Sequence, residues 1–236
     1  MSIERPLVSV ILPVYNGERY LRYALQSVFE QDYRPVDVIV VDDGSTDESA
    51  KIAQSQKEIR YIYQSNQGPA AARNTGIDVV QGEYLAFIDA DDMWAPNKLN
   101  VQIDYLLQHP EIYFTVGRVK NFIEPGIKKQ HLINKQVLLQ RDFIGLITIV
   151  ARKEAFAKVG KFNPEYKVAS DFEWFTRAKD AEVPMKILPD NLLLRRIHDS
   201  NLCIYDTQTV RKNLVRMFKN SIDQRKQKNE RGLNKK

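Results

Sequence analysis

The sequence predicts an α/β fold in which helices flank a mostly parallel central sheet. The first observation is that apolar runs rich in β-branched residues alternate four times with helical stretches in the first ninety residues. The second is that these runs are nearly unbroken, which is typical of strands buried on both faces. The third is an ordinary globular composition, with 236 residues of which 43% are hydrophobic.

The elements of the first half follow from residue spacing. Strands are predicted at residues 8–15, 36–41, 59–64 and 83–89. Apolar residues three and four apart predict a helix over 18–31. Thr46 is the expected N-cap of the next helix, with Asp47 and Glu48 in its first turn. The pair Gly68–Pro69 is expected to open a third helix over 70–80.

The second half is less regular. Helices are predicted at 97–109, at 153–159 with Gly160 closing it, at 172–181, and from Tyr205 onward as a long basic helix. Strands are predicted at 112–119, 143–151 and 191–198, with a break at Pro189 and Asp190. Residues 120–142 are polar and irregular and predict no element.

Polar side chains gather where three of the predicted strands end. These positions are Tyr15 and Asn16, Asp42 and Asp43, and Asp89, Asp91 and Asp92. Ligands of parallel sheets bind beyond the carboxyl ends of the strands. The sequence therefore predicts a binding site at this edge.

The acidic run Asp89–Ala90–Asp91–Asp92 is the sharpest feature of that site. Three carboxylates this close repel one another unless a cation or several donors neutralise them. Oxygen ligands suit Mg²⁺ or Mn²⁺. A solvated turn or helix cap is the alternative. For Asp42 and Asp43 the interpretations are binding of a nucleotide base or ribose, and capping of the following helix.

Four blocks in order carry a family resemblance: VSVILPVYNGERYL, VIVVDDGSTDES, GPAAARNTGI and GEYLAFIDADDMW. Together they cover about the first 100 residues, and the chain resembles family 2 glycosyltransferases. The resemblance implies a Rossmann-like domain of GT-A type, a nucleotide-sugar donor, a divalent metal ion (Mn²⁺ or Mg²⁺) and transfer with inversion. It also implies a nucleotide-binding half over 1–100 and an acceptor-binding half over 101–204.

The resemblance also assigns roles to individual residues. Tyr15 would stack on the base beside Pro13, Asp43 would bind the base, and Arg73 would reach the nucleotide. Asp89 would lie near the ribose and Asp91 would bind the metal. The implied nucleotide-sugar site is Pro13, Tyr15, Glu18, Asp42, Asp43, Arg73, Asp89 and Asp91, and the implied metal site is Asp91, Asp89 and His198. For Arg73 the alternative is a surface ion pair.

Inverting transfer needs a general base that takes the proton of the acceptor hydroxyl. The block VASDFEWFTR resembles the catalytic block of the family and puts Asp171 in that role. Ser170 stands where the family usually has Glu, so the support of the base is in question. Glu173 is expected to face elsewhere. The alternative is that Ser170 or Asp171 only caps the helix.

The run LLLRRIHDSN resembles a later, weaker block that closes the site. His198 would bind the metal or diphosphate, and Arg195 or Arg196 would neutralise phosphate. A plain structural role for His198 is the alternative. The Gln-x-x-Arg-Trp block of processive synthases is absent from the sequence. A single-addition hexosyltransferase acting in polysaccharide or glycolipid synthesis is therefore expected.

The net charge of +5 divides unevenly along the chain. Residues 211–236 carry +8 and residues 1–210 carry −3, which argues against a nucleic-acid partner. The expected division is a catalytic domain over 1–204 and a basic helical tail over 205–236. A helical stripe in the tail can contact an anionic membrane or pack on the domain; it comprises Val210, Leu214, Met217, Phe218 and Ile222. The expected acceptor is a glycan or a lipid-linked sugar.

Several protein classes are disfavoured by sequence alone. One cysteine, Cys203, excludes an internal disulfide framework, and neither a signal peptide nor a membrane-spanning run is visible. A cytoplasmic location is expected, with the tail able to reach the inner membrane face. Two other functions stay open: a nucleotidyltransferase of related fold and a non-catalytic nucleotide-sugar-binding module.

Overall fold

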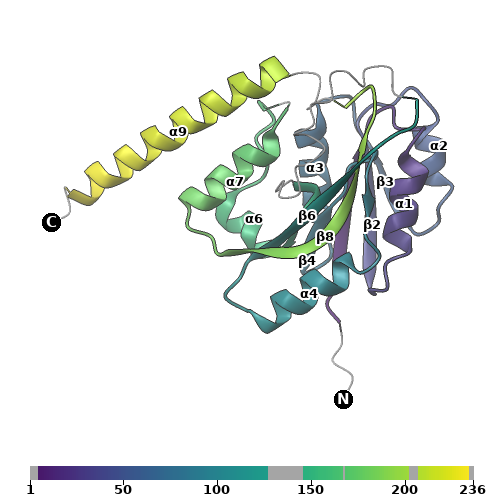
Figure 1. Cartoon of the computed structure of the whole chain (residues 1–236), viewed down its shortest axis with the longest axis horizontal. Coiled ribbons are helices and arrows are strands. Elements are labelled where there is room, and N and C mark those ends of the chain that lie inside the picture. Colours follow the sequence, from purple (N-terminus) through teal and green to yellow (C-terminus); the bar gives the residue numbers. More distant parts are fainter. Residues whose placement is uncertain (1–4, 127–145, 167, 202–206, 234–236) are drawn as a thin grey trace.

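The computed structural model describes residues 5–126, 146–166, 168–201 and 207–233. Within these ranges the strands form one sheet in the order β3-β2-β1-β4-β7-β6-β8-β5 (Figure 1). Its first half is parallel and consists of β1 (Val8–Val14), β2 (Val36–Asp42), β3 (Ile59–Tyr63) and β4 (Tyr84–Phe87). The predicted α/β fold with a mostly parallel sheet is confirmed.

Helices cover both faces of the sheet because side chains of each strand alternate between the two faces. One apolar core joins the sheet to α1 (Leu21–Phe29), α2 (Ser49–Gln54) and α4 (Lys98–Gln108). The other joins it to α3 (Pro69–Asp78), α6 (Lys153–Val159) and α7 (Ser170–Asp180). Each face of the sheet is thus covered by three of these helices.

The second half adds mixed strands to this sheet. They are β5 (Met93–Trp94), β6 (Phe114–Ile123), β7 (Val150–Arg152) and β8 (Met185–Ile197). β7 is antiparallel to β4 and β6, whereas β8 runs parallel to β6. The helix α9 (Thr207–Leu233) follows; Tyr205 lies outside the described residues.

Three predicted boundaries are wrong. The strand expected over 143–151 is a 3₁₀ turn at Leu146–Thr148 followed by β7, and 143–145 lie outside the described residues. Residues 120–123, for which no element was predicted, extend β6. Thr46 does not cap α2, since Glu48 is the N-cap and Asp47 and Glu48 precede the helix.

Pro189 and Asp190 do not break the chain either, because β8 passes through them. Ile187 pairs with Val116 and Asn191 pairs with Arg118, so three residues of β8 face the single Gly117. This bulge removes the need for a ladder hydrogen bond from the proline nitrogen. The strand therefore continues without interruption to Ile197, directly before His198.

Candidate active site

The acidic turn directly follows β4. The backbone N–H of Asp92 donates to the carbonyl of Asp89 over 3.2 Å, which folds the run back on itself. The carboxylate oxygens of Asp89, Asp91 and Asp92 lie within 4.8 Å of one another. The side chains of Asp89 and Asp91 are about one third exposed, at 35% and 32%, while Asp92 is buried. Two carboxylates thus face the solvent and the third lies beneath them.

Burial and repulsion within the acidic turn both change the pKa of Asp92. Burial raises the pKa of Asp92 well above its usual value, and the charges of Asp91 and Asp89 raise it further. The backbone N–H of Arg196 donates to its carboxylate over 2.9 Å, which offsets only part of this cost. A hard divalent cation fits this oxygen cluster, because its charge would favour ionised carboxylates.

His198 meets the acidic turn from the end of β8. Its Nε2 lies 2.9 Å from Oδ2 of Asp91, and its Nδ1 accepts from the N–H of Ser200 over 3.3 Å. Asn201 donates to the same Asp91 oxygen over 3.2 Å. Adjacent ligands of an octahedral ion at about 2.1 Å lie about 3 Å apart. The separation therefore lets Asp91 and His198 bind one ion, as an alternative to their mutual hydrogen bond.

Arg196 holds the acidic turn in place, and its guanidinium is not directed into the site as a phosphate ligand would be. Its guanidinium donates to the carbonyl of Asp91 over 3.2 Å and lies over the rings of Tyr20, Tyr23 and Phe122 at 4.8, 5.4 and 4.8 Å. These rings leave the residue only 9% exposed. The sequence motif held Arg196 but gave no signal for this role, because its ring partners come from distant elements.

Arg73 reaches the acidic turn from α3. Its Nη2 donates to Oδ1 of Asp89 over 2.6 Å. The arginine does pair with an acid, but it is only 7% exposed and is not a surface residue. Its Nε is buried and has no partner among the described residues. A buried guanidinium N–H without an acceptor is costly, so Arg73 contributes an unsatisfied donor beneath the acidic turn.

The loops after β1 and β2 are tied together. Asn16 N donates to Ser45 Oγ over 3.0 Å, and Gly17 N donates to Ser49 Oγ over 2.9 Å. Glu18 accepts from Glu48 N over 2.9 Å, which gives this side chain a structural role. Since these amides are already engaged, the first loop does not form a cradle for a triphosphate.

Pro13 and Tyr15 lie on this edge of the sheet. Pro13 is buried in β1 and pairs with Val41 of β2. The pairing of β1 with β4 ends before Pro13, at Phe87, so the missing N–H of the proline costs no ladder hydrogen bond there. Tyr15 is 54% exposed, so one face of its ring is open to a ligand. Pro13 and Tyr15 thus provide a buried apolar residue and an exposed aromatic ring two positions apart in sequence.

Asp42 and Asp43 are both buried and do not cap α2. Asp42 accepts from the hydroxyl of Tyr61 over 2.7 Å and from Ser45 N over 2.8 Å, and burial with this hydrogen bond raises the pKa of Tyr61. Asp43 accepts from Gly68 N over 2.8 Å and from Gln67 N over 2.9 Å. Asp43 therefore fixes the loop that begins α3 and carries Arg73.

Asp171 lies in the first turn of α7, half-buried behind the buried Ser170. The N-cap is Ala169, whose φ of 67° is left-handed and strained for a residue with a Cβ. The interpretation of Ser170 or Asp171 as a cap is thus wrong. α7 begins at the upper end of Figure 1, where β8 also ends.

Glu173 faces elsewhere, as expected. Its two carboxylate oxygens accept from Nε and Nη2 of Arg177 over 2.7 and 2.9 Å. Arg177 also donates to the carbonyl of Lys161 over 2.7 Å, which ties α7 to the preceding loop. Glu173 is therefore a structural anchor of α7.

Comparison with known proteins gives a family match. The model of Glycosyl transferase family 2 matches residues 9–177. An uncharacterized glycosyltransferase of Haemophilus influenzae is 43% identical over 160 residues, covering 64% of each chain. One of Rickettsia typhi is 32% identical over 209 residues, covering 83% of this chain and 65% of its own length. The chain thus spans just under two thirds of these relatives.

Two solved structures are similar in fold. The mannosyltransferase PcManGT from Pyrobaculum calidifontis, in complex with GDP-Man and Mn²⁺, has a TM-score of 0.71 at 22% identity, covering 93% of this chain and 65% of that one. S. aureus TarS 1–349 in complex with UDP-GlcNAc has a TM-score of 0.68 at 22% identity, covering 82% and 59%. None of the described helices is both long and apolar enough to span a membrane.

Proposed function

Because the chain belongs to glycosyltransferase family 2 and is a glycosyltransferase of GT-A fold, we propose that it inverts the anomeric centre of a nucleotide-diphosphate sugar. The donor is a UDP-sugar, the acceptor is a hydroxyl of a cell-surface glycan or glycolipid precursor, and one hexose is added per encounter. The observation that carries the proposal is the acidic turn, held between Arg73 and His198 at the carboxyl edge of the sheet.

The donor diphosphate lies against the acidic turn in this proposal. Asp91, Asp89 and His198 would hold a divalent ion, Mn²⁺ or Mg²⁺. When bound, such an ion offsets the negative charge that develops on the departing diphosphate. The clamp by Arg196 supports this role, because it fixes Asp91 and Asp92 before any ligand arrives.

The nucleotide base occupies the edge formed by β1 and β2. Tyr15 stacks on the base beside Pro13, and its 54% exposure leaves the ring face accessible. Arg73 contributes the positive charge of its guanidinium to the nucleotide site. Asp43 keeps one lone pair for a ring N–H of the base, while Asp42 acts through the turn at Ser45.

Asp171 is the proposed general base. The acceptor oxygen forms a bond to the anomeric carbon as the bond from that carbon to the diphosphate oxygen breaks. The acceptor proton passes to the Asp171 carboxylate, and the nucleotide diphosphate leaves with the electron pair. Ser170 is buried beside this residue, in the place where the family usually has Glu.

The test is release of UDP from a panel of UDP-sugars, with Mn²⁺ and with EDTA, in the presence of candidate acceptors. We expect Asp171→Asn to keep UDP binding and to lose transfer by 10²-fold or more, on the order expected for a general base. Asp91→Ala should lose both transfer and metal-dependent UDP binding. Asp32→Asn, at an exposed acid after α1, is the matched control.

Unchanged turnover in Asp171→Asn would refute the assignment of the base. Turnover that is equal with EDTA and with Mn²⁺ would refute the assigned role of the acidic turn. Donor binding without turnover on any acceptor would favour the non-catalytic module. The family assignment and the engaged amides of Asn16 and Gly17 oppose a nucleotidyltransferase activity.

A further inference from the structure

The helix α9 packs one face on the catalytic domain. Met217 is buried, and Leu214 is partly buried, against Tyr166, Ala169 and Phe172. Asn213 Nδ2 donates to the carbonyl of Val168 over 2.8 Å, and Ser221 Oγ donates to Asp180 over 2.7 Å. The predicted packing of the stripe on the domain is thus correct for Leu214 and Met217. The side chain of Val210 lies outside the described residues.

A second face of α9, next to the packed one, is apolar and exposed. Val215, Phe218 and Ile222 are 70%, 62% and 52% exposed. Spacings of three and four residues align them on one side of the helix. Burying three large apolar side chains is favourable, so an exposed aligned stripe of this kind indicates a surface that covers it.

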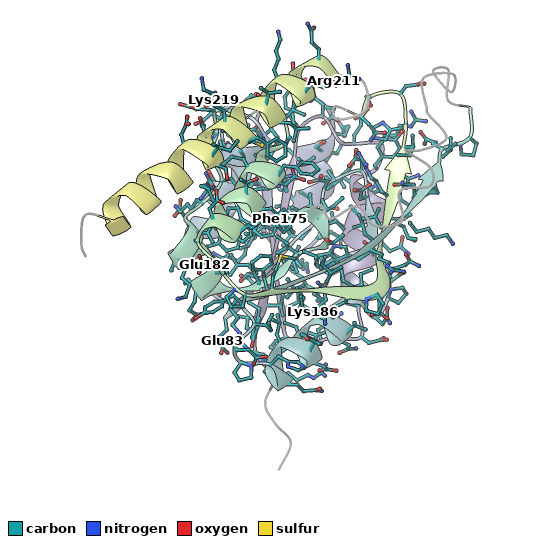
Figure 2. All side chains as sticks on the ribbon, turned by 60° about the vertical axis from the view of Figure 1, so that its left-hand side comes forward. Glu83, Phe175, Glu182, Lys186, Arg211 and Lys219 are labelled. Carbon is teal, nitrogen blue, oxygen red and sulfur yellow. The ribbon has the colours of Figure 1, made fainter. Side chains whose placement is uncertain are left out.

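Cations flank this stripe. Arg211, Lys212 and Lys219 are exposed, and Figure 2 shows Arg211 and Lys219 on the outer side of α9. Arg216 instead turns to the domain, where it pairs with Glu165. Asp223 is the acid among the described side chains of α9. The outer face is therefore both apolar and cationic.

We propose that this outer face of α9 lies on an anionic membrane surface. Val215, Phe218 and Ile222 enter the interfacial region, and Arg211, Lys212 and Lys219 contact the lipid phosphates. A second copy of the chain fits less well, because three side chains of one convex helix supply only part of the roughly 800 Å² per partner in a stable interface. The net charge of −3 over residues 1–210 directs this face, and not the body, toward the lipid.

Contact of α9 with a membrane would also determine where the acceptor meets the enzyme. This consequence rests on the proposed function. The packed face of α9 touches Ala169 and Phe172, the residues on either side of Ser170 and Asp171. The helix that would bind lipid is thus the one that supports the start of α7. We infer that the acceptor is presented at the membrane surface, as a lipid-linked sugar.

The test is co-sedimentation of the whole chain with vesicles of phosphatidylcholine, with and without one quarter phosphatidylglycerol, at 50 and 300 mM NaCl. We expect binding to the anionic vesicles that weakens at high salt. Each cation contributes about a five-fold factor to the partition coefficient. The triple variant R211E/K212E/K219E should therefore bind at least about a hundredfold more weakly.

Matched controls separate this face from overall charge and apolarity. K57E/K153E/K186E changes the same net charge at exposed lysines outside α9 and should bind like wild type. Phe218→Asp should lose binding, whereas Leu107→Asp, at an exposed leucine of α4, should keep it. Circular dichroism confirms that each variant is folded.

Three results would overturn the proposal: equal binding to zwitterionic and anionic vesicles, no loss in the α9 charge variant, or a concentration-dependent dimer that Phe218→Asp abolishes in sedimentation velocity runs. Failure here and failure of the proposed function are distinguishable. Vesicle binding needs no donor or turnover, and UDP release is measured with dispersed acceptors in the absence of vesicles.

Discussion

Asp91 joins parts of the chain that lie more than a hundred residues apart. Its carboxylate contacts His198 over 2.9 Å and Asn201 over 3.2 Å, and its carbonyl accepts from Arg196 over 3.2 Å. These contacts hold the exposed carboxylate in place without a ligand. Preorganisation of this kind reduces the cost of binding an ion or a diphosphate.

Asp92→Asn is predicted to stabilise the metal-free protein at pH 7.5–8. Burial raises the pKa of Asp92, so the folded chain holds a proton there at pH values where the unfolded chain, with a pKa near 4, has lost it. Stability therefore falls as pH rises from about 4 toward the folded pKa. Asparagine keeps an acceptor for Arg196 N without the charge. Thermal melts between pH 5 and 8 should show a higher Tm for the variant, most clearly at high pH.

Repeating the same thermal melts with Mn²⁺ provides a control. With Mn²⁺ the wild type should gain more in Tm than Asp92→Asn, because the ionised carboxylate favours a nearby cation. A variant that is less stable than wild type at every pH in EDTA would contradict the account of Asp92.

Arg196→Met is predicted to weaken Mn²⁺ binding by about 10–100-fold, the usual effect of removing support behind a ligand. Methionine keeps apolar contact with Tyr20 and Phe122 but cannot donate to the Asp91 carbonyl. Calorimetric titration of Mn²⁺ in the presence of UDP measures the change. Arg22→Met, at an exposed arginine of α1, is the control. Unchanged Mn²⁺ affinity in Arg196→Met would show that the clamp is dispensable.

At the scale of elements, sequence patterns predicted correctly those helix and strand ends that are determined by residues close in sequence. The helix over 153–159 has the predicted bounds, with Gly160 at a φ of 84° after it. The predictions that failed concern residues whose structure is determined by contacts with residues distant in sequence. Pro189 stays in β8 because Gly117 lets Leu192 approach, which no local pattern shows. Thr46 does not cap α2, because that helix begins only at Ser49, whose N–H donates to Asp47, while Thr46 is bound to Asn16 of the first loop.

Gly76→Ala is predicted to destabilise the protein by about 1–3 kcal/mol, the usual cost of overpacking. A Cβ at this position of α3 would lie 2.5 Å from Cγ2 of Ile11 in β1. Urea denaturation measures the effect. Ile11→Ala removes the clashing methyl at its own cost, so the double variant should be more stable than the sum of the two single changes predicts. Strict additivity would contradict the close packing of α3 on β1.

At the scale of the whole molecule, the fold brings Arg73 and the predicted metal ligands together. Asp89, Asp91, Arg73 and His198 form one contact network, as the motifs indicated. The sequence did not indicate the supporting contacts of Arg196, Asn201 and Tyr61, because their partners lie in other elements. Nor did it indicate that the Asp43 carboxylate also holds the loop that begins α3.

The central claim is that the acidic turn binds a nucleotide sugar through a divalent ion. The most direct measurement is a thermal-shift screen of UDP-, dTDP- and GDP-sugars, with Mn²⁺ and with EDTA, on wild type and Asp91→Asn. At 100 times its Kd, a donor should raise the Tm of wild type by about 5–10 °C with Mn²⁺. EDTA or Asp91→Asn should abolish that shift. A shift of equal size in EDTA, or in Asp91→Asn, would contradict the claim.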